Sequence, residues 1–209
     1  MKKIFCLIPC VLLIASCSSP SNRETFEIPQ IGMTFTYNAD VFQIPQKYGP
    51  YSVDLYEKEK STNGAGVVDI RFTPQGFRPE YGTSNEDYIG DIVSERPLEE
   101  LCNDPRWTKY PMAMEGCRVV ASPIPHVEFF TAHPGLGDRE TFFEKRAIFL
   151  TGNPELPGVI ISTNAKELTE KPALSQEAMQ QKLDAFANGT LKSAFIDEMD
   201  TLIRSIEFK

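Results

Sequence analysis

Apolar and polar residues alternate with two different periods along the chain, and the change of period divides it into a strand-rich part and a helical tail. Met33, Phe35 and Tyr37 alternate with threonines, which is the period of a half-buried strand. The same two-residue period at 51–55 and at 66–72 predicts two more strands, separated by a charged segment that contains a turn dipeptide. We therefore expect a set of antiparallel hairpins in this half.

Proline and glycine interrupt the middle of the chain. The elements expected there are a loop at 73–83, a short helix near 85–93, a turn of helix at Leu98 followed by an irregular stretch to Cys117, a strand at 127–131 and a loop at 133–138. The next two apolar runs, 142–150 and 158–162, are joined by a segment with proline and glycine and predict a β-hairpin.

The C-terminal tail changes to the helical period. From Ser175 onward, apolar residues recur every three or four positions until the stop signal Asn188-Gly189. A second apolar stripe predicts another helix that begins near Thr190. Because an amphipathic helix buries its apolar face, both helices should pack on the sheet. The predicted fold class is α+β, a largely antiparallel sheet with C-terminal helices packed on it.

The first residues have a different character. Two lysines precede an apolar run at 4–15, which is the outline of a secretory signal and is shorter than the roughly 20 residues of a membrane-spanning helix. The end of the run, Ile14-Ala15-Ser16-Cys17, resembles the lipobox of bacterial lipoproteins. The resemblance implies that residues 1–16 are removed as a signal peptide and that Cys17 carries the lipid. An ordinary cleaved signal with a cysteine near the cut is the alternative.

The lipobox resemblance also implies an address and a domain organisation. Ser18, and not an aspartate, follows the cysteine, which in Gram-negative bacteria favours the outer membrane with the domain facing the periplasm. Acyl chains such as palmitate would anchor the chain, because each buried methylene contributes about 0.8 kcal/mol. Residues 17–25 are small and polar and predict a lipidated flexible tether. Residues 26–209 should then form a single extracytoplasmic domain.

The charge of the chain excludes some partners. The sequence has 29 acidic and 21 basic residues, and removal of the signal takes Lys2 and Lys3, which leaves 29 against 19 and a net charge of −10. Such a surface repels phosphate groups, so we expect neither nucleic-acid binding nor a polybasic contact with lipid. The membrane contact is then the N-terminal lipid alone, and a cationic partner is compatible with the charge.

The cysteines predict one covalent crosslink. Two of the five leave with the signal and Cys17 takes the lipid, so Cys102 and Cys117 remain. In an oxidising compartment an isolated pair predicts a disulfide. The chain-entropy model gives about 3 kcal/mol for a loop of this length. A metal pair or a catalytic thiol is the alternative, although no supporting histidines accompany the two cysteines in sequence.

Two segments resemble the PsbP-like α/β/α sandwich found in exported bacterial lipoproteins. They are the opening Ile31-Gly32-Met33-Thr34-Phe35-Thr36-Tyr37 and the close from Phe195 to Phe208, which ends in Arg-Ser-Ile-Glu-Phe. The chain departs from the family at Asn38-Ala39-Asp40, where the family usually has a proline. The resemblance implies a fold, and it implies no activity and no functional residue.

The two histidines are the first candidates for chemistry. His126 and His133, with Glu128 and Asp138 nearby, have the donor types of a zinc or copper site. Their spacing of seven fits no local metal template and places them on opposite faces of a strand. We therefore expect exposed or capped histidines, no metal and no cofactor.

Other catalytic patterns are weak. The sequence has no Gly-x-Ser-x-Gly elbow, and its glycine pairs do not lead into helices as phosphate-binding loops do. The adjacent acids Glu99-Glu100 and Asp197-Glu198 would act as a glycosidase pair only across a cleft, and a solvated face is the simpler interpretation. Aromatic residues in Pro/Gly-rich segments are candidates for a binding face, with packing onto the core as the alternative. They are Tyr48, Tyr51, Phe77, Tyr81 and Trp107.

Together, the anchor and the weak catalytic patterns predict a non-enzymatic, membrane-anchored lipoprotein that binds a protein or an envelope component. The alternative is a periplasmic inhibitor or immunity lipoprotein whose acidic surface neutralises a cationic toxin or lytic enzyme. An envelope hydrolase with two facing carboxylates is a third hypothesis, which a structure with such a cleft would support.

Overall fold

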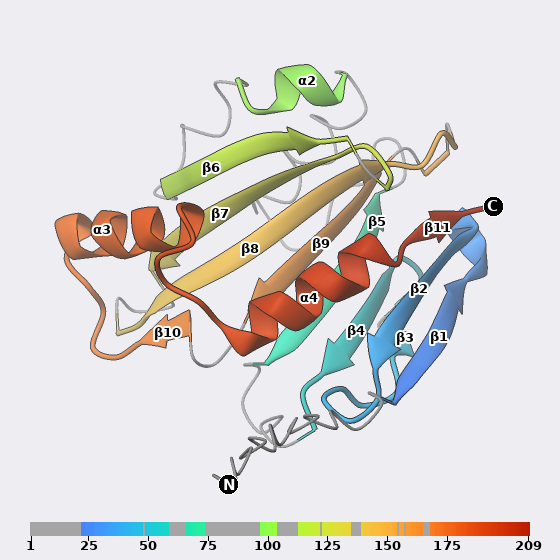
Figure 1. Cartoon of the computed structure of the whole chain (residues 1–209), viewed down its shortest axis with the longest axis horizontal. Helices are drawn as coiled ribbons and strands as arrows, with labels where there is room; N and C mark the ends of the chain where they lie inside the picture. Colours follow the sequence, from blue (N-terminus) through green and yellow to red (C-terminus); the bar gives the residue numbers. More distant parts are fainter. Residues whose placement is uncertain are drawn as a thin grey trace, which may run out of the picture.

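The structure is a computed structural model of the chain (Figure 1). It describes residues 22–47, 49–58, 66–73, 97–103, 113–121, 123–134, 139–153, 155–156, 158–164 and 168–209. The expected signal peptide at 1–16, Cys17 and the expected helix near 85–93 lie outside the described residues. Among the helices that are described, none is both long and apolar enough to span a membrane.

A large antiparallel sheet forms the centre of the molecule (Figure 1). Its strands are β3 (Gln46–Lys47), β4 (Ser52–Tyr56), β5 (Val67–Thr73), β6 (Ala113–Val120), β7 (His126–Pro134), β8 (Thr141–Leu150), β9 (Gly158–Asn164) and β10 (Thr169–Glu170). They lie in the order β3-β4-β5-β9-β8-β7-β6, and β10 also pairs with β8. Along this order, neighbours in the sheet are also neighbours in sequence except for β5 and β9, between which β6, β7 and β8 lie in the sequence.

The β8–β9 hairpin confirms the strand pair expected at 142–150 and 158–162. Arg146 pairs with Ser162, and Leu150 pairs with Gly158 at the end next to the turn. Consecutive residues of β8, including Ile148 and Phe149, are fully buried. A strand that is buried on both faces has a continuous apolar run, because both faces of the sheet are covered there.

A second sheet of three strands has the order β1-β2-β11 and lies beside β3 and β4 (Figure 1). β2 (Met33–Asn38) confirms the alternating strand expected near residue 35, and it pairs with β1 (Arg23–Ile28) and β11 (Glu207–Phe208). The expected tether at 17–25 is wrong from Arg23 onward, since β1 begins there. Most side chains of β1 are exposed and polar. Only Phe26, which packs on Phe35, and the buried Ile28 are apolar, and this pattern is too short to predict the strand without its backbone pairing with β2.

Two C-terminal helices, α3 (Gln176–Ala187) and α4 (Ala194–Arg204), cover the same face of the large sheet as the small sheet does (Figure 1). Ser175 caps α3 by accepting a hydrogen bond from the backbone N–H of Ala178 at 3.3 Å, at the position that the sequence predicts. α4 begins later than the expected Thr190, because Ser193 is the residue whose hydroxyl caps it, at 3.3 Å from the N–H of Ile196.

Two hydrophobic clusters lie on opposite faces of the large sheet. The larger cluster lies between the sheet and the layer of α3, α4 and the small sheet, and includes Phe35, Phe149 and Met199. The smaller cluster lies under the short helix α2 (Leu98–Leu101), which confirms the helical turn expected at Leu98, and includes Phe129. Sheets, helices and clusters together form an α+β fold, as the sequence predicts.

Two expectations for the middle of the chain are wrong. Residues 113–117, the end of the stretch expected to be irregular, belong to β6, and His133-Pro134 belongs to β7 rather than to a loop. Residues 104–112 lie outside the described residues. β6 lacks a clear strand pattern because it contains a bulge, where the register shifts between Glu115 and Arg118 and Gly116 has a φ of 65°. β7 extends further than expected because it stays paired with β8 over its whole length.

Candidate functional site

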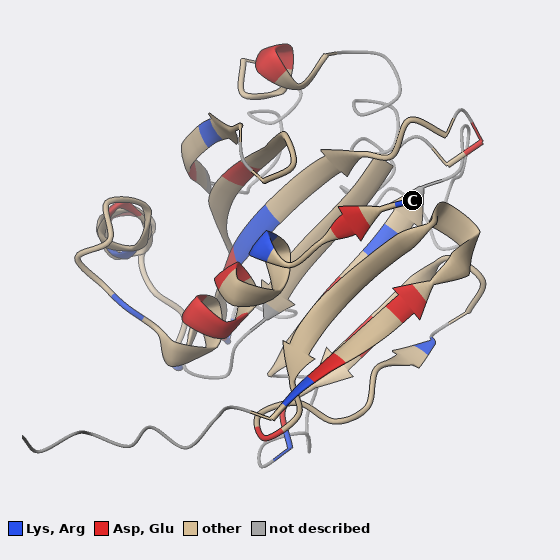
Figure 2. Ribbon diagram, turned by 45° about the vertical axis from the view of Figure 1, so that its right-hand side comes forward, with Lys and Arg blue, Asp and Glu red and all other residues tan. Residues whose placement is uncertain are grey.

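A cavity of about 290 Å³ lies between the end of α3, the start of α4 and strands β6 to β8; we call it the α3–α4 pocket. Its lining combines aromatic and aliphatic side chains with charges of both signs. The lining residues are Arg118, Phe130, Lys145, Phe186, Ala187, Asn188, Gly189, Leu191, Lys192, Ser193, Ile196, Asp197 and Asp200. Figure 2 shows basic positions on strands of the large sheet next to acidic positions on α4.

A buried carboxylate connects the charges at this pocket. Glu128 Oε1 lies 3.1 Å from His126 Nε2, and Glu128 Oε2 lies 3.0 Å from Arg118 Nη2 and 3.3 Å from Lys145 Nζ. Lys145 Nζ also forms an ion pair with Asp200 on α4. These five residues form the buried charge cluster, in which the side chains of His126 and Lys145 are only 2% and 3% exposed. The cluster joins three strands to a helix.

The sheet geometry explains why these residues meet. His126 and Glu128 are two positions apart on β7, so both side chains point to the face that α3 and α4 cover. Arg118 follows the bulge of β6 and lies opposite Glu128. Lys145 of β8 lies opposite Phe130, and its ammonium lies 5.8 Å from the centre of that ring. The four strand positions lie in three successive rows on this face of the sheet, those of β7 residues 126, 128 and 130, so their side chains meet.

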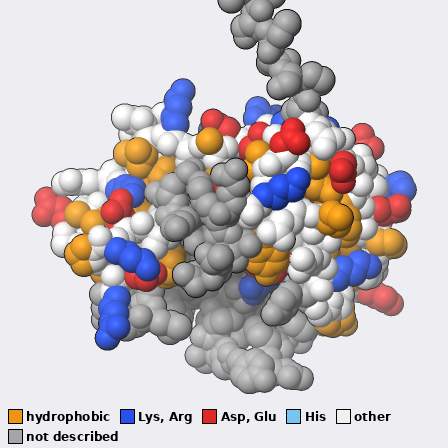
Figure 3. Space-filling view, turned by 90° about the horizontal axis from the view of Figure 1, so that it is seen from below, with side chains coloured by type: hydrophobic (Ala, Val, Ile, Leu, Met, Phe, Trp, Pro, Cys, Tyr) orange, Lys and Arg blue, Asp and Glu red, His pale blue; other side chains and the backbone are white. Residues whose placement is uncertain are grey.

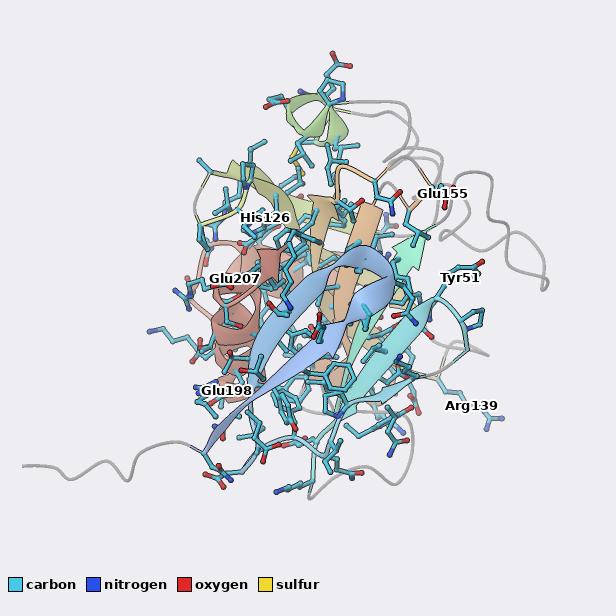
Figure 4. The ribbon with its side chains drawn as sticks, turned by 90° about the vertical axis from the view of Figure 1, so that its right-hand side faces the viewer. Tyr51, His126, Arg139, Glu155, Glu198 and Glu207 are labelled. Atoms are coloured by element: carbon cyan, nitrogen blue, oxygen red, sulfur yellow. A yellow bond between two sulfur atoms is a disulfide. The ribbon has the colours of Figure 1, made fainter. Side chains whose placement is uncertain are left out.

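Each ring nitrogen of His126 lies within hydrogen-bond distance of an oxygen atom. Nδ1 lies 2.7 Å from the carbonyl oxygen of Ile124, and Nε2 lies 3.1 Å from a carboxylate oxygen of Glu128. Both oxygens are acceptors when Glu128 is ionised, so the ring satisfies both only when it carries a proton on each nitrogen. The ring also stacks on Phe149, with centroids 4.6 Å apart. Figure 4 shows that His126 lies inside the molecule.

The ionisation of Glu128 follows from its neighbours. Burial by itself would raise the pKa of this carboxyl group. The hydrogen bond from His126, the charge of Lys145 and the hydrogen bond from Arg118 outweigh burial and lower the pKa from 4.5 to about 2. Glu128 is therefore an anion at neutral pH, and its carboxylate is the shared partner of His126, Arg118 and Lys145.

A second cavity, of about 490 Å³, lies near the start of the described chain; we call it the Tyr37 pocket. Tyr37 donates a hydrogen bond to Glu24 at 2.7 Å, and burial together with Glu24 raises the pKa of the phenol to about 12. Lys58 donates to the carbonyl oxygen of Ala39. The charged side chains of this larger cavity, Glu24 and Lys58, both bind groups of the same chain. The lining of the α3–α4 pocket includes the exposed charged residues Lys192 and Asp197 besides its paired charges, and we therefore place the candidate site there.

The structure separates the two histidines that the sequence singles out. His126 is buried, so the expectation of an exposed histidine is wrong for it, although its Nδ1 is capped by a backbone carbonyl as expected. His133 lies on β7, and its side chain is outside the described residues. Within the described part of the chain, no group of three or more His, Cys, Asp and Glu side chains is placed to hold a metal ion.

Cys102 and Cys117 meet beside the smaller hydrophobic cluster. Their sulfur atoms are 2.01 Å apart and their Cα atoms 5.5 Å apart, which is the geometry of a disulfide. The bond joins the residue after α2 to the bulge of β6. It lies on the side of the sheet opposite the buried charge cluster, so it stabilises the fold without contacting the pocket.

The remaining candidates are spread over the molecule. Tyr51 is half-buried and packs edge-on against Phe72, with centroids 6.3 Å apart, so it belongs to the core. The other four aromatic candidates, Tyr48, Phe77, Tyr81 and Trp107, lie outside the described residues. Glu99-Glu100 is exposed on α2, as a solvated face should be. Asp197, by contrast, lines the α3–α4 pocket, and Glu198 projects from α4 (Figure 4).

Sequence reasoning missed the centre of the site. The sequence pattern indicates Glu128 only as a neighbour of a possible metal site, and it does not indicate Lys145 or Asp200. One signal was available: a lysine two positions after Phe143, inside an apolar strand, needs buried carboxylates as partners. The partners lie on other elements, 17 and 55 positions away in sequence, and only the fold brings them together.

Comparisons with known proteins identify no family for this chain. No protein-family model and no curated protein matches this sequence. Among solved structures, the chain is similar to the solution structure of cyanobacterial PsbP (CyanoP) from Synechocystis sp. PCC 6803, with 13% identity and a TM-score of 0.41, over 94% of this chain and 99% of that one. A likeness at this identity and TM-score supports no conclusion about function.

Proposed function

We propose that the chain is an exported, lipid-anchored bacterial lipoprotein whose domain binds a protein or an envelope component without catalysing a reaction. The observation that carries the proposal is the α3–α4 pocket, whose wall holds charges that already neutralise one another. Side chains that are ordered before binding favour ligand binding, because less conformational entropy is lost when the complex forms. Acid–base catalysis instead favours a group that titrates near neutral pH, and the pKa of Glu128 is about 2.

The anchor part of the proposal rests on the lipobox resemblance at Cys17. Since β1 begins at Arg23, only residues 18–22 connect the lipidated cysteine to the first strand. A fully extended segment of this length reaches roughly 18 Å. The domain would therefore stay close to the outer membrane, facing the periplasm, and would meet partners at or near the membrane surface.

The net charge favours the alternative, an inhibitor or immunity lipoprotein for a cationic toxin or lytic enzyme. However, acidic side chains of the small sheet and of α4 have cationic partners of their own: Glu27 with Lys209 at 2.9 Å, and Glu198 with Arg23 at 3.2 Å. On the face drawn in Figure 3, basic and acidic side chains are interspersed. A pocket-based function is therefore better supported than an acidic docking face.

The anchor is tested by the intact mass of the protein extracted from membranes, for the wild type and for Cys17→Ala. We expect a lipid mass on the wild type that the variant lacks, and two further thiols, Cys102 and Cys117, that react with an alkylating reagent only after reduction. A soluble wild-type chain without lipid would contradict the anchor, and free thiols before reduction would contradict the disulfide.

Binding is tested with a photo-crosslinking amino acid placed at the exposed position of Lys192, which lines the pocket, in cells that make the full chain. The matched control carries the crosslinker at the exposed position of Lys47, on β3. We expect discrete crosslinked species from position 192 and not from position 47. Equal patterns from both positions would contradict a role for the pocket, and robust turnover of an envelope substrate by the purified domain would contradict a non-enzymatic role.

A further inference from the structure

The opening of the α3–α4 pocket has cationic hydrogen-bond donors that the ion pairs of the buried charge cluster do not occupy. Arg118 has a side chain that is 66% exposed, and it contacts Glu128 through a single nitrogen, Nη2. A guanidinium group has five N–H donors in a planar fork that matches a carboxylate. Lys192, in the connection between α3 and α4, is exposed and lines the same cavity. The pocket therefore offers cationic donors from two different elements.

An acceptor of opposite charge lines the same cavity. Asp197 lies in the first turn of α4 and is exposed, whereas Asp200, three positions later on the same helix face, forms its ion pair with Lys145. Asp197 is thus the carboxylate of the pocket that remains available to an incoming cation. A ligand that carried only an anionic group would meet this carboxylate unfavourably, and a purely cationic ligand would meet Arg118 and Lys192.

The rest of the lining is apolar. The rings of Phe130 and Phe186 stack with an angle of 13° between their planes and centroids 6.2 Å apart, and Leu191 and Ile196 complete the wall. Leu191 remains 37% exposed, so this surface is not fully covered by the chain itself. An aliphatic side chain of a ligand would bury apolar area against these residues.

We propose that the α3–α4 pocket binds a free α-amino acid with an aliphatic side chain. The ligand carboxylate binds Arg118 and Lys192, the ligand ammonium binds Asp197, and the side chain packs on Phe130 and Phe186. The cavity of about 290 Å³ is at the lower end of the range for small-molecule sites, roughly 300–1,000 Å³. This inference goes beyond the proposed binding of a protein or an envelope component and names a small-molecule ligand class for the same pocket.

The buried charge cluster gives this site its order. Glu128 forms an ion pair with Arg118, and Asp200 forms one with Lys145, whose ammonium lies near the Phe130 ring. Both cationic side chains are therefore ordered before the ligand binds, and less side-chain entropy is lost on binding. An ammonium group has three N–H donors. The ammonium of Lys145 contacts two carboxylates, those of Glu128 and Asp200. Its third donor therefore remains for the carboxylate of the ligand.

The test is a titration of residues 18–209, followed by ¹H–¹⁵N NMR, with three ligands that share the leucine side chain. Leucine carries both charges, leucinamide lacks the carboxylate, and N-acetylleucine lacks the ammonium. We expect leucine to shift the signals of Leu191 and Lys192, and each derivative to bind about tenfold or more weakly, because each leaves one charged group of the site unpaired. No shift with leucine, or equal affinity for the derivatives, would overturn the proposal.

Two variants test which side chain binds the ammonium and which binds the carboxylate of the ligand. Asp197→Asn should weaken leucine about tenfold, because the contact with the ammonium is lost, and should not weaken N-acetylleucine, whose only charge is repelled by Asp197. Lys192→Gln should weaken leucine and N-acetylleucine but not leucinamide. The matched control is Glu155→Gln, an exposed acid in the β8–β9 turn, which should change nothing. If Asp197→Asn binds leucine normally, the proposed orientation is wrong.

Failure of this inference is distinguishable from failure of the proposed function. Crosslinking from position 192 in cells does not depend on leucine. Crosslinked species together with no leucine binding would overturn the amino-acid ligand and retain a pocket that binds an envelope component. Leucine binding together with no crosslinked species would support the ligand and contradict a macromolecular partner at this mouth.

Discussion

The chain contains two kinds of ion pair in two regions, and their heavy-atom distances are similar. Under α4, Lys145 lies 3.3 Å from Glu128 and is only 3% exposed. At the edge of the small sheet, Lys209 lies 2.9 Å from Glu27, with both side chains about half exposed or more. Distance therefore does not separate the two pairs, and burial does. Removing one partner of a buried pair leaves an uncompensated charge, whereas water replaces a lost partner at the surface.

This contrast also separates two roles. The buried charge cluster links β6, β7 and β8 to α4 and forms one wall of the α3–α4 pocket. The pair at the small sheet joins β1 to the last residue of the chain and lines neither of the two cavities described above. Changes to the first region should alter both stability and binding, and changes to the second should alter neither by much.

The largest effect is expected for Lys145→Met. The variant keeps the length of the side chain but leaves Glu128 and Asp200 without the ammonium between them. Breaking a buried ion pair by removal of one partner costs about 3–5 kcal/mol, and urea denaturation would measure the loss. The matched change at the surface, Lys209→Met, should cost less than about 1 kcal/mol. Equal losses in the two variants would contradict the comparison.

The next effect is a loss of folding stability at acidic pH. The pKa of Glu128 is lowered on folding from 4.5 to about 2. A lowered pKa contributes stability that is present in full above the unfolded value and is lost as the pH falls through the folded value, here between about 4.5 and 2. The contribution is about 3 kcal/mol.

Unfolding free energies at several pH values, for the wild type and for Glu128→Gln, would measure this contribution. The variant should be less stable near neutral pH and should lose less stability on acidification. Glu27→Gln, at the exposed pair, should follow the wild-type curve. Parallel curves for wild type and Glu128→Gln would show that the carboxylate does not carry the acid dependence.

A smaller effect is expected at alkaline pH in the Tyr37 pocket. Burial, and then the hydrogen bond to and the charge of Glu24, raise the pKa of Tyr37 from 10 to about 12. A raised pKa contributes stability that is present in full below the unfolded value, and this contribution is lost as the pH rises from 10 to about 12. Ultraviolet titration of tyrosine should show one late phenol that Tyr37→Phe removes. A wild-type titration in which all the phenols ionise with midpoints near pH 10 would contradict the assignment.

The smallest effect is expected for Glu27→Gln itself. Its partner Lys209 is 65% exposed, and exposed pairs contribute about 0–1 kcal/mol, less at high salt. Thermal unfolding at low and high salt should place this variant within about 0.5 kcal/mol of the wild type. A loss of several kcal/mol would mean that the strand pairing of β1, and not only the ion pair, depends on Glu27.

Much of the fold could be predicted from the sequence where one element carries its own pattern. The β8–β9 hairpin has two apolar runs around a proline- and glycine-containing turn, and α3 has both a serine cap and an Asn-Gly stop. β1 and β6 could not be predicted in this way. The first is specified by backbone pairing with β2, and the second is interrupted by a bulge at Gly116.

The candidate site could be predicted only in fragments. His126 and Glu128 are close in sequence, and their separation of two already places them on one face of a strand. Lys145 comes from β8 and Asp200 from α4, and neither pattern nor spacing relates them to Glu128. The disulfide was different, since counting cysteines left a single pair, and the structure places those two sulfur atoms within bonding distance.

The central claim is that the ionised carboxylate of Glu128 fixes the groups around it, among them the ring of His126. The most direct measurement is a long-range ¹H–¹⁵N NMR spectrum of the imidazole nitrogens at neutral pH. The chain has only two histidines, so a His126→Gln variant assigns the signals. We expect both nitrogens of His126 to be protonated, because one faces the Ile124 carbonyl and the other the Glu128 carboxylate. A neutral ring with one unprotonated nitrogen would contradict the claim.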